Sequence, residues 1–234
     1  MKLRIEGVAL DCLMVRLFDE IAESNMPWML AASENLRAAF AGQLIDLVPS
    51  YTTLMVHYDL NALSPAQARE LIAEALIDLS PNTRSSGQCH VLPVWYDLSV
   101  GPELSLLAKR SGLTVEEVIR RHSEREYQVF ALGFAPGFAF MGLVEEALAA
   151  PRLNTPRKKV AAGSVGIAER QTAAYPAVSP GGWNLIGRTP ARLFDRDREG
   201  YSLMQPGDTA RFAPISHAEF INLGGDDTPL EVQA

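Results

Sequence analysis

The chain has 234 residues, of which 47% are hydrophobic and 21% are charged, and its formal net charge is −7. This composition is typical of a folded globular protein and excludes an intrinsically disordered one. The length exceeds the roughly 100–150 residues of a common domain and favours two domains. The acidic balance argues against nucleic acid as a partner, because such binding depends on neutralising phosphates with Lys and Arg.

The first part of the chain alternates strand and helix patterns. Gly7 to Phe18 and Tyr51 to Tyr58 are rich in apolar, β-branched or aromatic residues, which predicts strands. Pro27 to Phe40 begins with a proline and predicts a helix. Ser64-Pro65-Ala66-Gln67 is a capping-box pattern that predicts the start of a second helix.

A further strand, Cys89 to Tyr96, would complete an α+β domain with a ferredoxin-like order of elements. The polar stretch Asn82 to Gly87 predicts a linker, which places the domains at residues 1–85 and 86–234. Helices are predicted over Glu103 to Arg110 and from Thr114 to about His122. From residue 127 onward, short apolar runs alternate with Pro and Gly turns, which favours a β-barrel or sandwich.

Localisation is inferred from the cysteines and the apolar segments. Cys12 and Cys89 lack any zinc-binding spacing and are interpreted as reduced, buried thiols. Glu6 and Asp11 interrupt the start of the chain, so no secretory apolar region forms there. The longest uncharged apolar stretch, Val129 to Val144, falls short of the ~20 residues of a spanning helix. We therefore expect a cytoplasmic protein with no membrane partner.

The segment from Pro151 to Pro190 concentrates positive charge. It holds six Lys and Arg residues against the single acid Glu169, so its balance is +5 while the rest of the chain carries −12. Such a concentration favours a site for a small anion, a carboxylate or a phosphate. The alternative is a solvated basic turn whose charges pair with acids elsewhere.

Two glycine- and aromatic-rich stretches are candidate parts of that site. The glycines of Ser179 to Trp183 could aim backbone N–H groups at an oxyanion, and Gly163 to Gly166 could do the same. A plain tight turn with a packed tryptophan is the alternative. Gly133 to Gly142 predicts an aromatic pocket wall or a contact with another polypeptide, with a buried loop as the alternative.

The four histidines do not suggest a metal centre, because no spacing brings two of them together. His90 shares a predicted strand face with Val94, which favours a packed histidine over a general base. His122 falls near a helix C-terminus, where a cation is favoured. No Walker loop, HExxH, GxSxG or dinucleotide fingerprint occurs, so any use of ATP would proceed without a Walker loop.

The order and density of motifs between about His90 and Phe212 carry a family resemblance. These motifs are Leu132 to Gly142, Pro151-Arg152, Pro156-Arg157, Ala162 to Ile167, Gln171-Thr172, Tyr175-Pro176, Ser179 to Trp183, Leu185 to Thr189 and Gln205 to Asp208. The chain resembles the allophanate hydrolase subunit 1 family. That family includes a sensor-kinase inhibitor and the B subunit of prokaryotic 5-oxoprolinase.

The resemblance implies a cyclophilin-like β-barrel as the second domain. It also implies one part of a complex that opens 5-oxo-L-proline to L-glutamate with ATP as co-substrate. In such a complex the chain would be inactive alone, and its partners would be homologues of the C subunit (allophanate hydrolase subunit 2) and of the 5-oxoprolinase A subunit. The alternatives within the family are an inhibitor of a sensor histidine kinase and a protein that works with urea carboxylase or allophanate hydrolase.

The same motifs supply the candidate site residues. The candidates for catalysis are Arg157, Arg188 and His90. The candidates for binding a small anionic substrate are Arg152, Ser164, Gln171, Tyr175, Ser179, Gly181, Gly182, Trp183 and Thr189.

The chain departs from the family pattern at a few positions. Ala161 stands where proline is usual, and Glu169 where glycine is usual. Ala173-Ala174 replaces Gly-Ile, and Phe140 replaces a common tyrosine. The lost prolines and glycines put the local turn geometry in question, and Phe140 removes a hydroxyl that could have touched a ligand.

Overall fold

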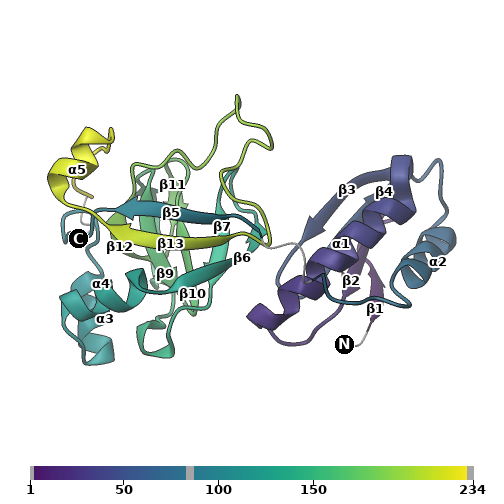
Figure 1. Ribbon diagram of the computed structural model, residues 1–234, viewed down its shortest axis with the longest axis horizontal. Coiled ribbons are helices and arrows are strands. Elements are labelled where there is room, and N and C mark those ends of the chain that lie inside the picture. Colours follow the sequence, from purple (N-terminus) through teal and green to yellow (C-terminus); the bar gives the residue numbers. More distant parts are fainter. Residues whose placement is uncertain (1–2, 83–86, 231–234) are drawn as a thin grey trace. The chain divides into compact units, whose positions relative to one another are not determined.

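The computed structural model describes residues 3–82 and 87–230. The chain divides into two compact units, Met1–Ser86 and Gly87–Ala234 (Figure 1). Each unit has its own sheet and its own buried core. Within the described ranges, no helix is long and apolar enough to cross a membrane.

The first unit is a four-stranded antiparallel sheet with two helices. Its elements are β1 (Arg4–Gly7), β2 (Cys12–Arg16), α1 (Met26–Phe40), β3 (Leu44–Pro49), β4 (Thr53–Tyr58) and α2 (Pro65–Ala75), with short 3-10 turns at Glu23–Asn25 and Ala41–Gln43. The strand order in the sheet is β1-β2-β4-β3. Helix α1 packs on β3 and β4 and against α2 (Figure 1).

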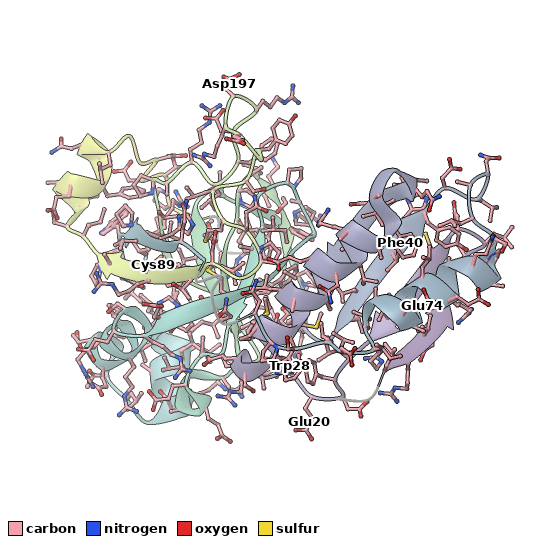
Figure 2. The ribbon with its side chains drawn as sticks, turned by 45° about the vertical axis from the view of Figure 1, so that its right-hand side comes forward. Glu20, Trp28, Phe40, Glu74, Cys89 and Asp197 are labelled. Carbon is pink, nitrogen blue, oxygen red and sulfur yellow. The ribbon has the colours of Figure 1, made fainter. Side chains whose placement is uncertain are left out.

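Local sequence explains these helices. Ser64 caps α2 by accepting from the Gln67 backbone N–H, and the Gln67 side chain accepts from the Ser64 N–H, so the predicted capping box is confirmed. Proline in the first turn of both helices fits a position that lacks an intrahelical partner. Figure 2 labels Phe40 at the end of α1 and Glu74 on α2; Phe40 is buried, whereas Glu74 is exposed.

The ferredoxin-like order predicted for this unit is not what the structure shows. A ferredoxin-like domain runs β-α-β-β-α-β, whereas this unit runs β-β-α-β-β-α. The cause is the strand at Cys89–Val94 (β5), which pairs in parallel with a strand of the second unit instead of joining the first sheet. One ferredoxin-like feature is present: β2 and β3 are connected through α1, and β4 lies between these two strands in the sheet.

The second unit is dominated by a seven-stranded sheet in the order β12-β9-β10-β7-β6-β13-β5. Its strands are β5 (Cys89–Val94), β6 (Glu126–Leu132), β7 (Ala139–Gly142), β9 (Ser164–Ala168), β10 (Gln171–Ala174), β12 (Asn184–Arg188) and β13 (Thr209–Pro214). A separate pair is formed by β8 (Arg157–Val160) and β11 (Ser179–Gly181). The helices are α3 (Leu104–Ser111), α4 (Val115–Ser123) and α5 (His217–Asn222), with a 3-10 turn at Glu146–Leu148.

A backbone pair joins the two edges of the large sheet. Trp95 follows β5, Arg188 ends β12, and each donates its N–H to the other's carbonyl at 2.9 Å. The sheet is therefore nearly closed into a barrel, which leaves few unpaired edges. A mainly-β second unit with a barrel-like sheet agrees with the sequence-based expectation.

Buried apolar residues of the second unit form two separate clusters. Alternate residues of β9 and β12, such as Val165, Ile167 and Ile186, pack into the larger core. Ala168 and Leu185 belong to a smaller cluster with Phe138, Tyr175 and Trp183 on the opposite face of the strands. That second face carries the candidate site.

The helices of the second unit follow their sequence signals. Helices α3 and α4 are found where they were expected; Gly112 ends α3 at φ 69°, and Thr114 caps α4. Helix α5 was not expected, although Ser216 and Glu219 form a capping box that signals it. Figure 2 shows Asp197 on the loop between β12 and β13, which projects from this unit.

His122 differs from its prediction as a helix-terminal cation. It is fully buried, and burial lowers its pKa to about 3, so the ring is neutral. The Thr172 hydroxyl donates to the Gly166 carbonyl, which makes His122 Nε2–H the donor to Thr172 at 2.9 Å. Nδ1 then accepts from the Tyr96 hydroxyl at 2.8 Å. Desolvation outweighs the helix dipole here.

Candidate small-molecule site

The smaller apolar cluster of the second unit contains a cavity of about 90 Å³. Most of its wall is aromatic or glycine, and one cation lies at its edge. The lining residues are Phe134, Phe138, Phe140, Arg152, Tyr175, Gly181, Gly182 and Trp183. We call this cavity the aromatic pocket.

The aromatic wall is built by the turn between β6 and β7 together with residues after β10 and β11. Phe138 is buried at the centre, with its ring 5.3 Å from Tyr175 and 5.6 Å from Trp183, both edge to face. Phe140 contacts Phe138 edge to face at 4.9 Å. Edge-to-face contacts of this kind hold the rings in fixed orientations, which makes a preformed apolar wall.

Phe134 forms the outer rim of the pocket. Its ring lies 5.2 Å from that of Phe138, yet the side chain is 63% exposed. Its backbone has φ 66°, a region that costs a non-glycine residue roughly 1–2 kcal/mol. The segment therefore forms a pocket wall, one of the two predicted roles, while a contact of the exposed Phe134 with another polypeptide stays a prediction.

Gly181 is needed for the close approach of β11 to Tyr175. A Cβ atom at Gly181 would lie 2.3 Å from the Tyr175 hydroxyl oxygen, whereas one at Gly182 would make ordinary contacts with Pro156 at 3.5 Å and the Leu153 carbonyl at 3.7 Å. Neither glycine adopts a positive φ, and Gly181 belongs to a strand. The backbone nest expected at these glycines is therefore not formed; Gly181 makes room for the Tyr175 phenol instead.

The polar groups of the pocket are a phenol and a guanidinium. Burial raises the Tyr175 pKa, while a hydrogen bond with the Trp183 backbone and the cations Arg152 and Arg157 oppose that rise. The phenol is therefore neutral near pH 7 and can donate a hydrogen bond. Arg152 is exposed at the pocket and can meet a negative charge. This arrangement suits a small molecule with a flat apolar body and a carboxylate.

Arg157 lies on β8 opposite Gly181, and its guanidinium is partly engaged, because Nη1 is buried without a hydrogen-bond partner among the described residues. Its Nη2 donates to Glu103 Oε1 at 2.5 Å, and Glu103 Oε2 accepts from the Leu185 N–H at 2.8 Å. Both side chains are nearly buried. The pair ties the start of α3 to β8 and β12, which gives Arg157 a structural partner; a catalytic role for Arg157 stays a prediction.

Other predicted residues gather around Arg188, at the end of β12. Arg188 is buried, and its Nη1 donates to the carbonyls of Asp226 at 2.6 Å and Thr228 at 2.8 Å. Ser164 is its direct partner across the strands. Thr189 accepts from the Ala191 N–H with its hydroxyl and shapes the turn that follows.

Three further candidates do not line the aromatic pocket. His90 Nε2 pairs with Asp208 Oδ2 at 2.9 Å, next to the first residues of β5. Gln171 begins β10 opposite Ala168, at the end of that strand remote from Tyr175. Ser179 begins β11 opposite Val160. The predicted set is thus divided between the aromatic pocket, the Arg188 region and separate positions.

Sequence reasoning missed two groupings. Glu103 pairs with Arg157 across 54 residues of chain, and no local pattern signals such a pair. In the first unit, ligand atoms of Asp11, Cys12 and His57 lie within 4.8 Å of one another, with His57 Nε2 3.2 Å from Asp11 Oδ2. Cys12 and His57 are direct cross-strand partners on β2 and β4, a relation that strand pairing alone creates. The expectation that both cysteines are buried is wrong, because Cys12 is half-buried and Cys89, the first residue of β5, is exposed.

Comparison with known protein families identifies the family to which the chain belongs. The model described as "carboxyltransferase domain, subdomain C and D" matches residues 3–204, which is most of the chain. The chain belongs to this family. A relative of full length is the B subunit of 5-oxoprolinase from Bacillus subtilis, 35% identical over 227 residues, with 93% of this chain and 95% of the relative covered. The B subunit of 5-oxoprolinase from Escherichia coli O157:H7 is 47% identical over 123 residues, or 53% of this chain and 56% of the relative.

Solved structures of similar proteins share the fold of this carboxyltransferase-family chain. TTHA0988 is 36% identical with a TM-score of 0.77, and the match covers 89% of this chain but only 40% of that one. PH0987 of Pyrococcus horikoshii is 36% identical over 93% of this chain and all of that one, with a TM-score of 0.56. Kluyveromyces lactis urea carboxylase is 14% identical with a TM-score of 0.76, covering 97% of this chain and 23% of that one, a likeness of fold alone.

Proposed function

We propose that this chain is the B-type subunit of an ATP-dependent 5-oxoprolinase that opens 5-oxo-L-proline to L-glutamate. The proposal is supported by the full-length relative, which is named as the B subunit of 5-oxoprolinase, since one subunit implies others. In this proposal the partners are homologues of the C subunit and of the A subunit, and the chain is inactive without them.

The aromatic pocket is the observation that carries the proposal. The substrate is a small five-membered ring with one carboxylate and one lactam carbonyl. The faces of Phe138 and Trp183 suit the ring, and Arg152 suits the carboxylate. The neutral Tyr175 hydroxyl can donate to the lactam oxygen. A cavity of about 90 Å³ allows only a small ligand.

The chemistry of the reaction explains why partners are needed. A lactam amide is unreactive, so its oxygen must be phosphorylated or strongly polarised before water can attack. The sequence has no Walker loop, and we place ATP binding in the assembled complex. The exposed Phe134 at the rim is a natural point of contact with a partner, because large exposed aromatics are enriched at interfaces.

The experiment is a reconstitution of the complex from this chain and its two partner proteins, followed by ATP-dependent release of glutamate from 5-oxo-L-proline. We expect Arg152→Ala to raise KM at least about tenfold, which corresponds to the loss of one charged hydrogen bond. Lys159→Ala, on the neighbouring strand β8 and exposed, is the matched control and should leave KM unchanged. Absence of hydrolysis by the complete wild-type complex would contradict the proposal.

A further inference from the structure

The buried arginine at the end of β12 carries more hydrogen-bonding capacity than its surroundings use. Arg188 is 1% exposed, and its Nη1 is occupied by the carbonyls of Asp226 and Thr228. Its Nε and Nη2 are buried and have no hydrogen-bond partner among the described residues. Nε–H and Nη2–H form one edge of the guanidinium and point in parallel, which is the geometry that receives two oxygens of one carboxylate or phosphoryl group.

A second unused donor lies on the neighbouring strand, at the position paired with Arg188. Ser164 on β9 is the direct cross-strand partner of Arg188, so both side chains project from the same face of the sheet. Ser164 is completely buried, and its hydroxyl has no partner in the described part of the chain either. Adjacent strands thus place three unpaired donors and one positive charge together in the interior.

Nearby acids do not neutralise this arginine directly. The Asp226 carboxylate accepts from the Thr228 N–H, and Asp227 pairs with His217 at 2.9 Å. Burial lowers the Arg188 pKa, and the two aspartates oppose this only through space. A buried cation whose hydrogen-bonded partners are neutral carbonyls is costly, and an anion on the free edge would offset that cost.

We propose that Arg188 and Ser164 form a binding site for a small oxyanion, a carboxylate or phosphoryl group, which the C-terminal segment 226–230 covers. The carbonyls of Asp226 and Thr228 accept the hydrogen bonds of Nη1, while the Nε–Nη2 edge binds the ligand. The inference goes beyond the proposed function, because none of the pocket-lining residues belongs to this site.

The covering segment is held by a few polar contacts and by the side chain of Leu230, which packs against the smaller apolar cluster. Apart from Arg188, its described polar links to the body of the unit are the exposed His217–Asp227 pair and a hydrogen bond from the Leu230 N–H to the Ser99 carbonyl at 3.1 Å. Exposed ion pairs contribute little to stability. We therefore expect the segment to separate at the cost of these links and of the Leu230 contact, while the hydrogen bonds of the barrel strands stay in place.

The test is calorimetric titration of inorganic phosphate and, separately, of acetate into the full chain and into a chain that ends at Gly225. We expect saturable binding of at least one anion, tighter in the shortened chain. Ser164→Ala should weaken binding about 3–10-fold, the effect of one neutral hydrogen bond. Arg188→Lys keeps the charge but loses the two-donor edge, and should weaken it more than about 10-fold. The anion that binds identifies the ligand class.

Lys159→Ala removes an exposed cation elsewhere on this unit and should bind as the wild type does. Should Arg188→Lys fail to fold, Ser164→Ala decides the matter, because it removes one oxygen atom and no charge. The site is refuted if neither chain binds either anion, or if Ser164→Ala leaves the affinity unchanged. Equal affinity of the full and shortened chains would refute the covering role of the segment. Neither readout depends on hydrolysis, so failure here is distinguishable from failure of the proposed function.

Discussion

Single residues show what a charge pattern can and cannot predict. The basic segment drew attention to several arginines, and one of them, Arg152, lines the aromatic pocket. The partners of Arg157 and Arg188 were not predictable, because Glu103 and the carbonyls of Asp226 and Thr228 come from distant parts of the chain. Sequence reports the sign of a charge, whereas folding decides which group satisfies it.

The buried pair of Glu103 and Arg157 gives a prediction on stability. Glu103→Ala leaves a buried guanidinium without its carboxylate and the Leu185 N–H without its acceptor. We expect a loss of about 3–5 kcal/mol in the free energy of unfolding, measured by urea denaturation. Glu124→Ala breaks only an exposed pair with Arg120 and should cost much less. Equal losses in the two variants would show that the Glu103 pair is not effectively buried.

The buried, neutral His122 gives a prediction on pH dependence. Its folded pKa of about 3 lies below the ordinary 6.5, so between these values the unfolded chain binds a proton that the folded chain does not. As the pH drops below 6.5, protonation of His122 in the unfolded chain lowers the free energy of unfolding by about 1.4 kcal/mol per pH unit; above pH 6.5 this loss is absent. Urea denaturation at pH 7 and pH 5 should show a difference roughly 2 kcal/mol larger in the wild type than in His122→Gln. The same difference in both proteins would rule out His122 as its source.

At the scale of elements, local signals were reliable and long-range pairing was not. The capping residues Ser64 and Thr114 and the terminal Gly112 mark helix ends as expected. The parallel pairing of β5 with β13 joins residues about 120 positions apart, such as Cys89 and Thr209, and overturned the ferredoxin-like prediction. Cap chemistry is local, whereas the partner of a strand depends on the whole chain.

The turn between β9 and β10 shows why glycine is the usual residue at position 169 in the family. Glu169 stands where glycine is usual, and its φ is 51°, a region that disfavours residues with a Cβ atom. Glu169→Gly should therefore raise the free energy of unfolding by about 0.5–1 kcal/mol, as measured by urea denaturation. Lys158→Gly, at an exposed strand position, should lower it instead. A loss of stability on Glu169→Gly would mean that the glutamate side chain contributes more than its backbone costs.

The whole molecule combines two units, and the second carries both the aromatic pocket and the buried Arg188. The resemblance of motifs led to the family, and the match over residues 3–204 confirms it. Motif order could not show that the candidate residues divide between separate places. Residues that are close in sequence, such as Leu185 and Ile186 on β12, project from opposite faces of a strand, and only the folded sheet assigns each face to a core or a site.

The central claim is that the aromatic pocket binds a small ring carboxylate through Arg152. Of the three tryptophans, Trp183 lines the pocket, so in a Trp28→Phe/Trp95→Phe background its fluorescence reports the pocket alone. Titration with 5-oxo-L-proline should change this fluorescence saturably, and adding Arg152→Ala should weaken the apparent affinity at least about tenfold, while Lys159→Ala should not. A fluorescence that does not respond, or that responds equally in the Arg152→Ala protein, would contradict the claim.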